Sequence, residues 1–269
     1  MRGALRFVAL GALAAGCGGT TGSGLVTFGA AAAGASDAPG TGQWVFDTPV
    51  GFHVTLTKAT LHVGAVYLNA SVPVSGAQET SCILPGVYVA QVTRGRDVDL
   101  LSATLQPFPV DGEGKADAAK AGELWLMGVS DVNAQADTTP ILVLAGSASY
   151  GTTTLAFSGT LTIGANRVTK PTNAAEPGSH PLCKERIVTP IPANVTPQDG
   201  GTLVVRIDAR QLLAAVNFTD ADFLAKDGTA DGTAVVFDDH SNTAPSRTLY
   251  QALHAAALVY RFEWLPGGP

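Results

Sequence analysis

The clearest pattern along the chain is an alternation of apolar and polar residues, with a period of two, within residues 52–70. A period of two places one set of side chains on the buried face of a β-strand and the other set on the opposite face. Gly64 interrupts the pattern and predicts a bend in the chain. The apolar positions are Phe52, Val54, Leu56, Ala59, Leu61, Val63, Val66 and Leu68.

Similar short stretches recur along the rest of the chain, separated by turn-forming residues. Two of them, residues 141–150 and 152–163, predict a strand pair with Gly151 as the turn. Helices are expected at residues 209–216, where Asp208 can cap the first turn, and at residues 248–257. Other strands are expected at residues 86–93, 97–101, 123–129, 202–208, 234–237 and 259–264. The pattern therefore predicts a mainly all-β protein, an antiparallel β-sandwich with one or two short helices.

Residues 166–201 carry six prolines and predict a long proline-rich loop. This density argues against a regular helix or a central strand, because proline lacks the backbone donor that both structures use. A loop of this length in a compact domain is usually functional or mobile.

The first residues of the chain resemble a signal. Arg2 and Arg6 precede the uncharged residues 7–15, which are too few to span a bilayer as a helix. Ala15-Gly16-Cys17 follows and resembles the lipobox of bacterial lipoproteins, in which the chain is cut before a cysteine that carries the lipid. The resemblance covers residues 1–17 and implies that Cys17 is lipidated. The alternative is an ordinary secreted protein cut near Ala15.

This interpretation defines the expected domain organisation. Residues 1–17 form the signal, residues 18–42 are rich in Gly, Ala, Ser and Thr and predict a flexible tether, and residues 43–265 form a single β-sandwich domain. The expected location is the bacterial cell envelope, with the protein lipid-anchored and facing the periplasm or the surface. The lipid bilayer is then a partner through the N-terminal lipid.

The negative net charge of the chain argues against nucleic-acid binding. The chain has 16 Lys and Arg against 22 Asp and Glu, a net charge of −6, and loss of Arg2 and Arg6 with the signal leaves −8. Such a chain repels phosphate backbones, so it is not expected to bind nucleic acid. A protein or small-molecule ligand is not specified by the sequence.

Two cysteines remain if Cys17 carries lipid. Cys82 and Cys183 are then expected to form a disulfide in an oxidising compartment, which would attach the proline-rich loop to the domain. Two buried free thiols and a two-cysteine metal site remain as alternatives.

Two groups of residues are candidate metal ligands. His53 and His62 could approach each other and bind copper or zinc if Lys58-Ala59 forms a turn, with Met127 or His180 as a third ligand. If the strand is straight, the two histidines are too far apart. The second group, in residues 220–232, is a candidate calcium site, with ordinary solvated turns as the alternative. Its residues are Asp220, Asp222, Asp227 and Asp231.

Catalytic signatures are absent from the sequence: it contains no Gly-x-Ser-x-Gly, His-Glu-x-x-His or phosphate-loop motif. No catalytic residue and no cofactor other than a metal ion is therefore predicted. The leading interpretation is a membrane-tethered exported lipoprotein that acts as a non-catalytic binding or structural module. The alternatives are a copper- or zinc-binding lipoprotein that uses the strand histidines, and a hydrolase with a site under the 166–201 loop.

Overall fold

The structure is a computed structural model, and it describes residues 24–40, 42–72, 86–127, 138–163, 185–239 and 241–267. Strands predominate in these residues and the helices are short, which confirms the predicted fold class. The helices are α2 (Ala209–Leu213), α3 (Ala221–Asp227), α4 (Ala244–Leu253) and α5 (Ala256–Val259).

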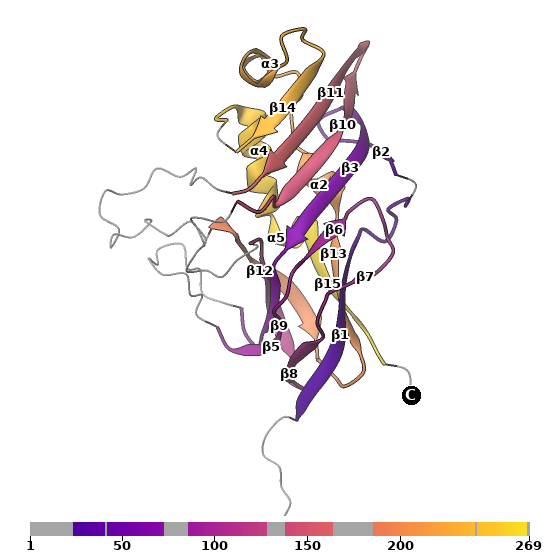
Figure 1. The fold of residues 1–269 in the computed structure, drawn as a ribbon, viewed down its shortest axis with the longest axis vertical. Helices are drawn as coiled ribbons and strands as arrows, with labels where there is room; N and C mark the ends of the chain where they lie inside the picture. The colour runs from indigo at the N-terminus through magenta and orange to yellow at the C-terminus, as the bar shows by residue number, and fades with distance from the viewer. Residues whose placement is uncertain are drawn as a thin grey trace, which may run out of the picture.

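The described strands form two sheets, a larger one with nine strands and a smaller one with six. Figure 1 shows the smaller sheet toward one end of the long axis and the larger sheet toward the other. The larger sheet has the order β12 (Ile187–Val195), β9 (Ala119–Trp125), β4 (Ala65–Asn69), β5 (Tyr88–Val92), β8 (Gly112–Lys115), β1 (Leu25–Gly34), β13 (Thr202–Ile207) and β15 (Tyr260–Leu265), and β7 (Gln106–Pro107) pairs with β1. The smaller sheet has the order β14 (Ala234–Asp238), β11 (Thr153–Leu161), β10 (Leu142–Tyr150), β3 (His53–Val63) and β2 (Trp44–Asp47), and β6 (Arg96–Asp99) pairs with β3.

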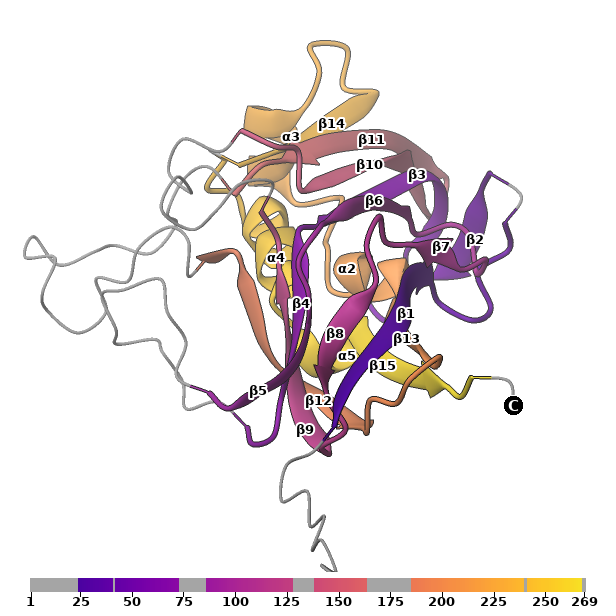
Figure 2. The ribbon, with the colours of Figure 1, turned by 60° about the horizontal axis from the view of Figure 1, so that its bottom comes forward.

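The larger sheet curls strongly, so that strands far apart in its order come together (Figure 2). A Cβ atom added to Gly122 on β9 would lie only 2.2 Å from the ring of Phe262 on β15. Glycine at this position lets the aromatic ring pack directly on the backbone of the opposite strand. The arrangement is therefore sandwich-like with a nearly closed, barrel-like larger sheet.

Strand β3 contains a β-bulge at Thr57, next to Lys58-Ala59, where the sequence was compatible with either a turn or a straight strand. On β10, Ala145 pairs with Lys58 and Gly146 pairs with Leu56, so Thr57 is left out of the register. The extra residue shifts the phase of the pattern, and Leu56 and Ala59 are both buried, at 1% and 2% exposed. The hairpin alternative at Lys58-Ala59 is therefore wrong, and β3 continues through it as one strand.

Gly64 forms the corner at which the chain passes from the smaller sheet to the larger one, between β3 and β4. A Cβ atom at this position would lie 1.8 Å from the carbonyl oxygen of Met127, closer than any real contact. The bend predicted at Gly64 is confirmed, and its physical reason is the close approach of two backbones.

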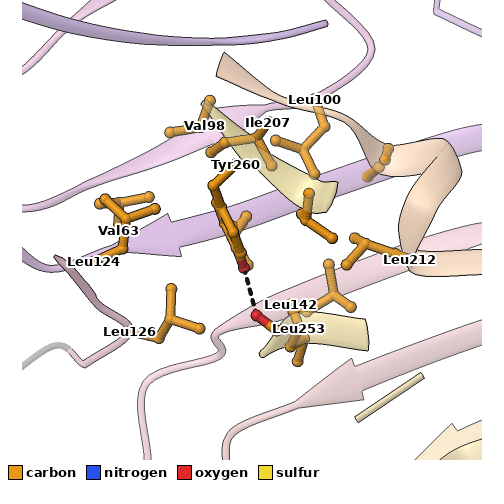
Figure 3. Close-up of a cluster of buried hydrophobic side chains, with 14 of the residues drawn as sticks. Val63, Val98, Leu100, Leu124, Leu126, Leu142, Ile207, Leu212, Leu253 and Tyr260 are labelled. Carbon is orange, nitrogen blue, oxygen red and sulfur yellow. Dashed lines mark hydrogen bonds between the residues drawn. The ribbon is translucent and has the colours of Figure 1, made fainter. Parts of the chain in front are cut away.

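The core fills the space between the sheets and the helices, as Figure 3 shows. Leu124 and Leu142, one from each sheet, are fully buried there, and so is Leu253 of α4. Each such side chain contributes about 1.5–3 kcal/mol by leaving water. Tyr260 donates a hydrogen bond of 2.9 Å to the carbonyl of Leu253, and burial raises the pKa of its hydroxyl.

The predicted flexible tether at residues 18–42 is wrong for the residues that form β1. This strand lies inside the larger sheet between β8 and β13, and Ala32 and Ala33 are fully buried. Both faces are covered from Ala30 to Gly34, where the sequence shows no alternation, whereas Leu25 and Thr27 at the start of the strand are exposed. At Gly34 an added Cβ would lie 2.2 Å from the carbonyl oxygen of Leu100, so small residues fit where larger ones cannot. The folded domain thus includes Leu25 and does not begin at residue 43.

The prediction of a continuous loop over residues 166–201 is also wrong in its second half. Residues 187–195 form β12, at one end of the order of the larger sheet. Its pairing with β9 shifts register on either side of Ile191 and Pro192. An edge position tolerates Pro190 and Pro192 because their missing backbone donors need no partner there.

The predicted helices are present with different bounds. Asp208 accepts a hydrogen bond from the backbone of Arg210 and caps α2, as expected. The second helix begins earlier than residue 248, at Ala244, because Pro245 suits the first turn of a helix. Residues 221–227 were expected to be loop but form α3, capped by Asp220.

Candidate functional site

A groove of about 370 Å³ lies on the outer face of the smaller sheet. The bulge in β3 turns Lys58, Thr60 and His62 to this face, while Ala59 and Leu61 point to the core. Polar side chains and an apolar wall therefore line one open surface. The other lining residues are Asp97, Thr139, Pro140 and Val143.

His62 is held in this groove by Asp97. The two residues are direct partners in the antiparallel pairing of β3 with β6, and His62 Nδ1 lies 2.7 Å from Asp97 Oδ1. The His62 side chain is 16% exposed and that of Asp97 is 69% exposed. An ionised Asp97 accepts a hydrogen bond from the Nδ1–H group of neutral His62 and leaves the Nε2 lone pair available, as carboxylates do for metal-binding and basic histidines.

His53 repeats this arrangement at the start of β3. It pairs with Asp47 across β2 and β3, with 2.8 Å between His53 Nδ1 and Asp47 Oδ1. Its side chain is 57% exposed, and it does not line the groove. Each imidazole thus contacts an aspartate through its Nδ1 atom, and the His53 side chain is more exposed than that of His62.

The structure does not bring His53 and His62 together. Nine residues of extended strand separate them, which corresponds to about 30 Å at the usual rise per residue. Met127 is buried and lies outside the groove lining, and His180 lies outside the described residues. Among the residues that the structure describes, no group of three or more His, Cys, Asp or Glu side chains could hold a metal ion.

The groove offers several binding groups and no assembled catalytic set. Lys58 supplies a positive charge, Thr60 a hydroxyl group and His62 a ring nitrogen, beside the apolar side chain of Val143. Within the described residues, no hydrogen bond joins the Thr60 hydroxyl to His62. This combination suits a small polar ligand that offers an acceptor to the amine and a hydroxyl group that can donate to the free Nε2 of the imidazole.

Two of the four aspartates predicted for calcium belong to α3. Asp220 caps the helix by accepting a 2.9 Å hydrogen bond from the backbone of Phe223. Asp222 forms an exposed ion pair with Lys226, one turn later. Both carboxylates therefore have ordinary helical roles.

The other two aspartates accept hydrogen bonds from the hydroxyl groups of nearby serine and threonine side chains. Asp227 Oδ2 accepts hydrogen bonds from Ser241 at 2.6 Å and from Thr243 at 2.7 Å, and so connects the end of α3 to the start of α4. Asp231 accepts from the hydroxyls of Thr229 and Thr233 in the turn before β14. These bonds, led by the one from Thr229, lower the pKa of Asp231 to about 2. The structure thus places the four carboxylates at caps and turns.

A buried carboxylate on β9, Glu123, was missed by the sequence reasoning. It is fully buried and accepts hydrogen bonds from Asn69 at 2.9 Å and from the indole of Trp125 at 3.1 Å. The Tyr88 hydroxyl donates a longer bond of 3.5 Å, and the Tyr67 ring packs against those of Tyr88 and Trp125. Burial first, and then the charge of Glu123, raise the pKa of Tyr88 to about 12.

Three protein donors accompany this carboxylate, which accounts for its burial without a ligand. A signal for it was present in the sequence, because Glu123 is a charged residue at the start of the apolar stretch 123–129. The predicted disulfide residues Cys82 and Cys183 and the predicted lipid site Cys17 lie outside the described residues, so they stay predictions.

Comparison of the chain with models of protein families, with curated proteins and with solved structures found no match. Within the described residues, none of the helices has the length and apolar character needed to cross a membrane.

Proposed function

We propose that this protein is an exported, lipid-anchored binding module that holds a small polar ligand with a hydroxyl group in the groove on the outer face of β3. The N-terminal resemblance to a lipobox supports the anchor. The groove supports the binding role, because it gathers an amine, hydroxyl groups and an oriented imidazole on a rigid sheet.

The observation that carries the proposal is the position of His62. Of the two carboxylate-paired histidines on β3, His62 lines this groove and His53 does not, and the His62 side chain is largely buried. The site therefore combines orientation of the imidazole with room for a ligand beside it.

A ligand titration with matched variants tests the binding role. The probes are inorganic phosphate and small hydroxycarboxylates, which carry both acceptor oxygens and a hydroxyl donor, added to the purified protein and followed by isothermal titration calorimetry. His62→Ala and Lys58→Ala should abolish binding of a probe that the native protein binds, whereas His53→Ala should bind it unchanged. Equal loss in His62→Ala and His53→Ala, or no binding of any probe by the native protein, would contradict this site.

A labelling experiment tests the anchor separately. Growth with labelled fatty acid should transfer label to the native protein and leave Cys17→Ser unlabelled and released from the membrane fraction. Label on the Cys17→Ser variant would contradict lipidation at this residue. The location in the bacterial cell envelope, facing the periplasm or the surface, depends on this result.

A hydrolase is the second candidate, and one observation favours it. The His62–Asp97 pair has the geometry of a general base and the carboxylate that orients it. A screen of ester, amide and phosphoester substrates would detect such an activity, which His62→Ala should remove. The copper or zinc alternative receives no such support, because His53 and His62 lie at opposite ends of β3. A metal-content assay of the purified protein tests it.

A further inference from the structure

The first residues of β1 form part of an exposed apolar surface. Leu25 is 84% exposed, Val87 is 62% exposed and Tyr88 is 42% exposed. Leu25 and Tyr88 line one groove of about 490 Å³, which lies between β1, β8 and β5. Large apolar side chains that remain exposed around a groove are typical of an interaction surface.

The sequence before β1 limits what this surface can contact. Eight peptide steps separate Cys17 from Leu25, and a fully extended chain covers at most about 26–29 Å over that number of steps. A lipid on Cys17 would therefore keep Leu25 within that distance of the bilayer. The start of β1 also lies at one end of the long axis, whereas the turn between β10 and β11 lies at the other end (Figure 1).

We propose that the surface formed by Leu25, Val87 and Tyr88 rests on the bilayer that holds the lipid of Cys17. This inference depends on the lipid anchor of the proposed function. Tyrosine rings favour the headgroup level of a membrane, and the exposed aliphatic side chains can enter its apolar boundary.

Lys115 adds a polar contact of the right sign. It is exposed, lines the same groove and is the direct cross-strand partner of Leu25. A lysine can extend its ammonium to a lipid phosphate while its aliphatic chain covers apolar surface. Glu113 lines the same groove and accepts a 2.8 Å hydrogen bond from Gln91, and the protein as a whole is acidic, with a net charge of −8 once the signal is removed, so anionic lipids repel most of it. The contact is therefore confined to the anchored end.

Photo-cross-linking of the full chain in its own membrane tests the surface. Tyr88 is replaced by p-azidophenylalanine, which keeps the tyrosine ring and carries an azide in place of the hydroxyl, and Tyr150 is replaced in the same way as the matched control. Tyr150 is 57% exposed and ends β10, at the distant end of the molecule. Position 88 should cross-link to labelled phospholipid several-fold more efficiently than position 150.

A second cross-linking position shows whether a negative result at position 88 is due to misfolding of that variant. The same group at Leu25, whose side chain is almost fully exposed, should also cross-link to lipid, and all variants should resist protease as the native protein does. If the protein carries the fatty-acid label but positions 25 and 88 do not cross-link preferentially to lipid, the proposed membrane-contacting surface is wrong and the lipid anchor stands. Absence of fatty-acid label would overturn the anchor and this surface together.

Discussion

His62 and Asp97 are direct cross-strand partners whose Nδ1 and Oδ1 atoms lie 2.7 Å apart, in a groove on the outer face of the smaller sheet. His53 and Asp47 repeat the pairing at the other end of the same strand, at 2.8 Å, outside the groove. The two pairs provide an internal comparison, because their bonding is alike and their exposure differs.

Asp97→Ala should change the tautomer of neutral His62. An ionised Asp97 favours the proton on Nδ1, and without it the proton should move to Nε2, the nitrogen usually protonated in free imidazole side chains. Long-range proton–nitrogen NMR of the imidazole rings measures the change. The fold should remain intact, because an exposed pair of this kind contributes only about 0–1 kcal/mol.

The control for that experiment is Asp47→Ala, which should shift the tautomer of His53 and leave His62 unchanged. If the native protein instead shows the His62 proton on Nε2, the inferred orientation of this imidazole, with its Nδ1–H group toward Asp97, is wrong.

Asp227→Ala should destabilise the contact between α3 and α4. The change removes the carboxylate that accepts hydrogen bonds from the fully buried Thr243 hydroxyl and from Ser241, and a hydrogen bond to a charged group contributes about 1.5–3 kcal/mol. Urea unfolding measures the loss. Asp222→Ala is the matched control, since its exposed pair with Lys226 contributes about 0–1 kcal/mol. Equal effects of the two changes would show that the hydroxyl network does not stabilise the fold.

Gly64→Ala should destabilise the corner between β3 and β4. The added Cβ would meet the carbonyl oxygen of Met127 at 1.8 Å, and because that atom is backbone the strands must separate. Overpacking of this kind typically costs about 1–3 kcal/mol, measurable by thermal or urea unfolding. Gly24→Ala, at a position with no atom within 4 Å of the added Cβ, should have little effect. A neutral Gly64→Ala would refute the close backbone approach.

The stability of the protein should fall as the pH rises from about 10 to about 12. The pKa of Tyr88 is about 12 in the folded protein and 10.0 for an ordinary tyrosine. The unfolded state therefore loses this proton first, and the free energy of unfolding decreases with pH across that interval. Urea unfolding at several pH values should show a shallower decrease in Tyr88→Phe, and Tyr260, whose pKa burial also raises, supplies part of the remainder. An unchanged slope would contradict the shift at Tyr88.

Cys82 and Cys183 should appear as a linked pair of peptides in a non-reducing map of the exported protein. The proposed export would place both thiols in an oxidising compartment, and lipidation of Cys17 would leave them as the remaining pair. Both cysteines recovered as alkylated free thiols would contradict the bond.

Local sequence patterns predicted the parts of the fold that depend on neighbouring residues. The alternation in residues 52–70 predicted β3 and β4, Gly64 predicted the corner between them, and Asp208 predicted the cap of α2. These features were predictable because a strand face, a bend and a helix cap are each determined within a few residues.

Other features depended on contacts between distant segments. The second half of strand β1 has no alternation because its residues are buried on both faces, and β12 accommodates its prolines because it lies at an edge. The bulge at Thr57 could not be distinguished from a turn by periodicity alone, since both shift the phase of the pattern.

The sequence by itself therefore determined the β class, the position of His62 on the polar face of a strand, and the lipobox-like start of the chain. The tertiary structure decided that Asp97, 35 residues away, orients that histidine, and that the exposed Leu25 and Tyr88 share a groove. The physical reason is that strand pairing brings together residues whose separation along the chain carries no periodic signal.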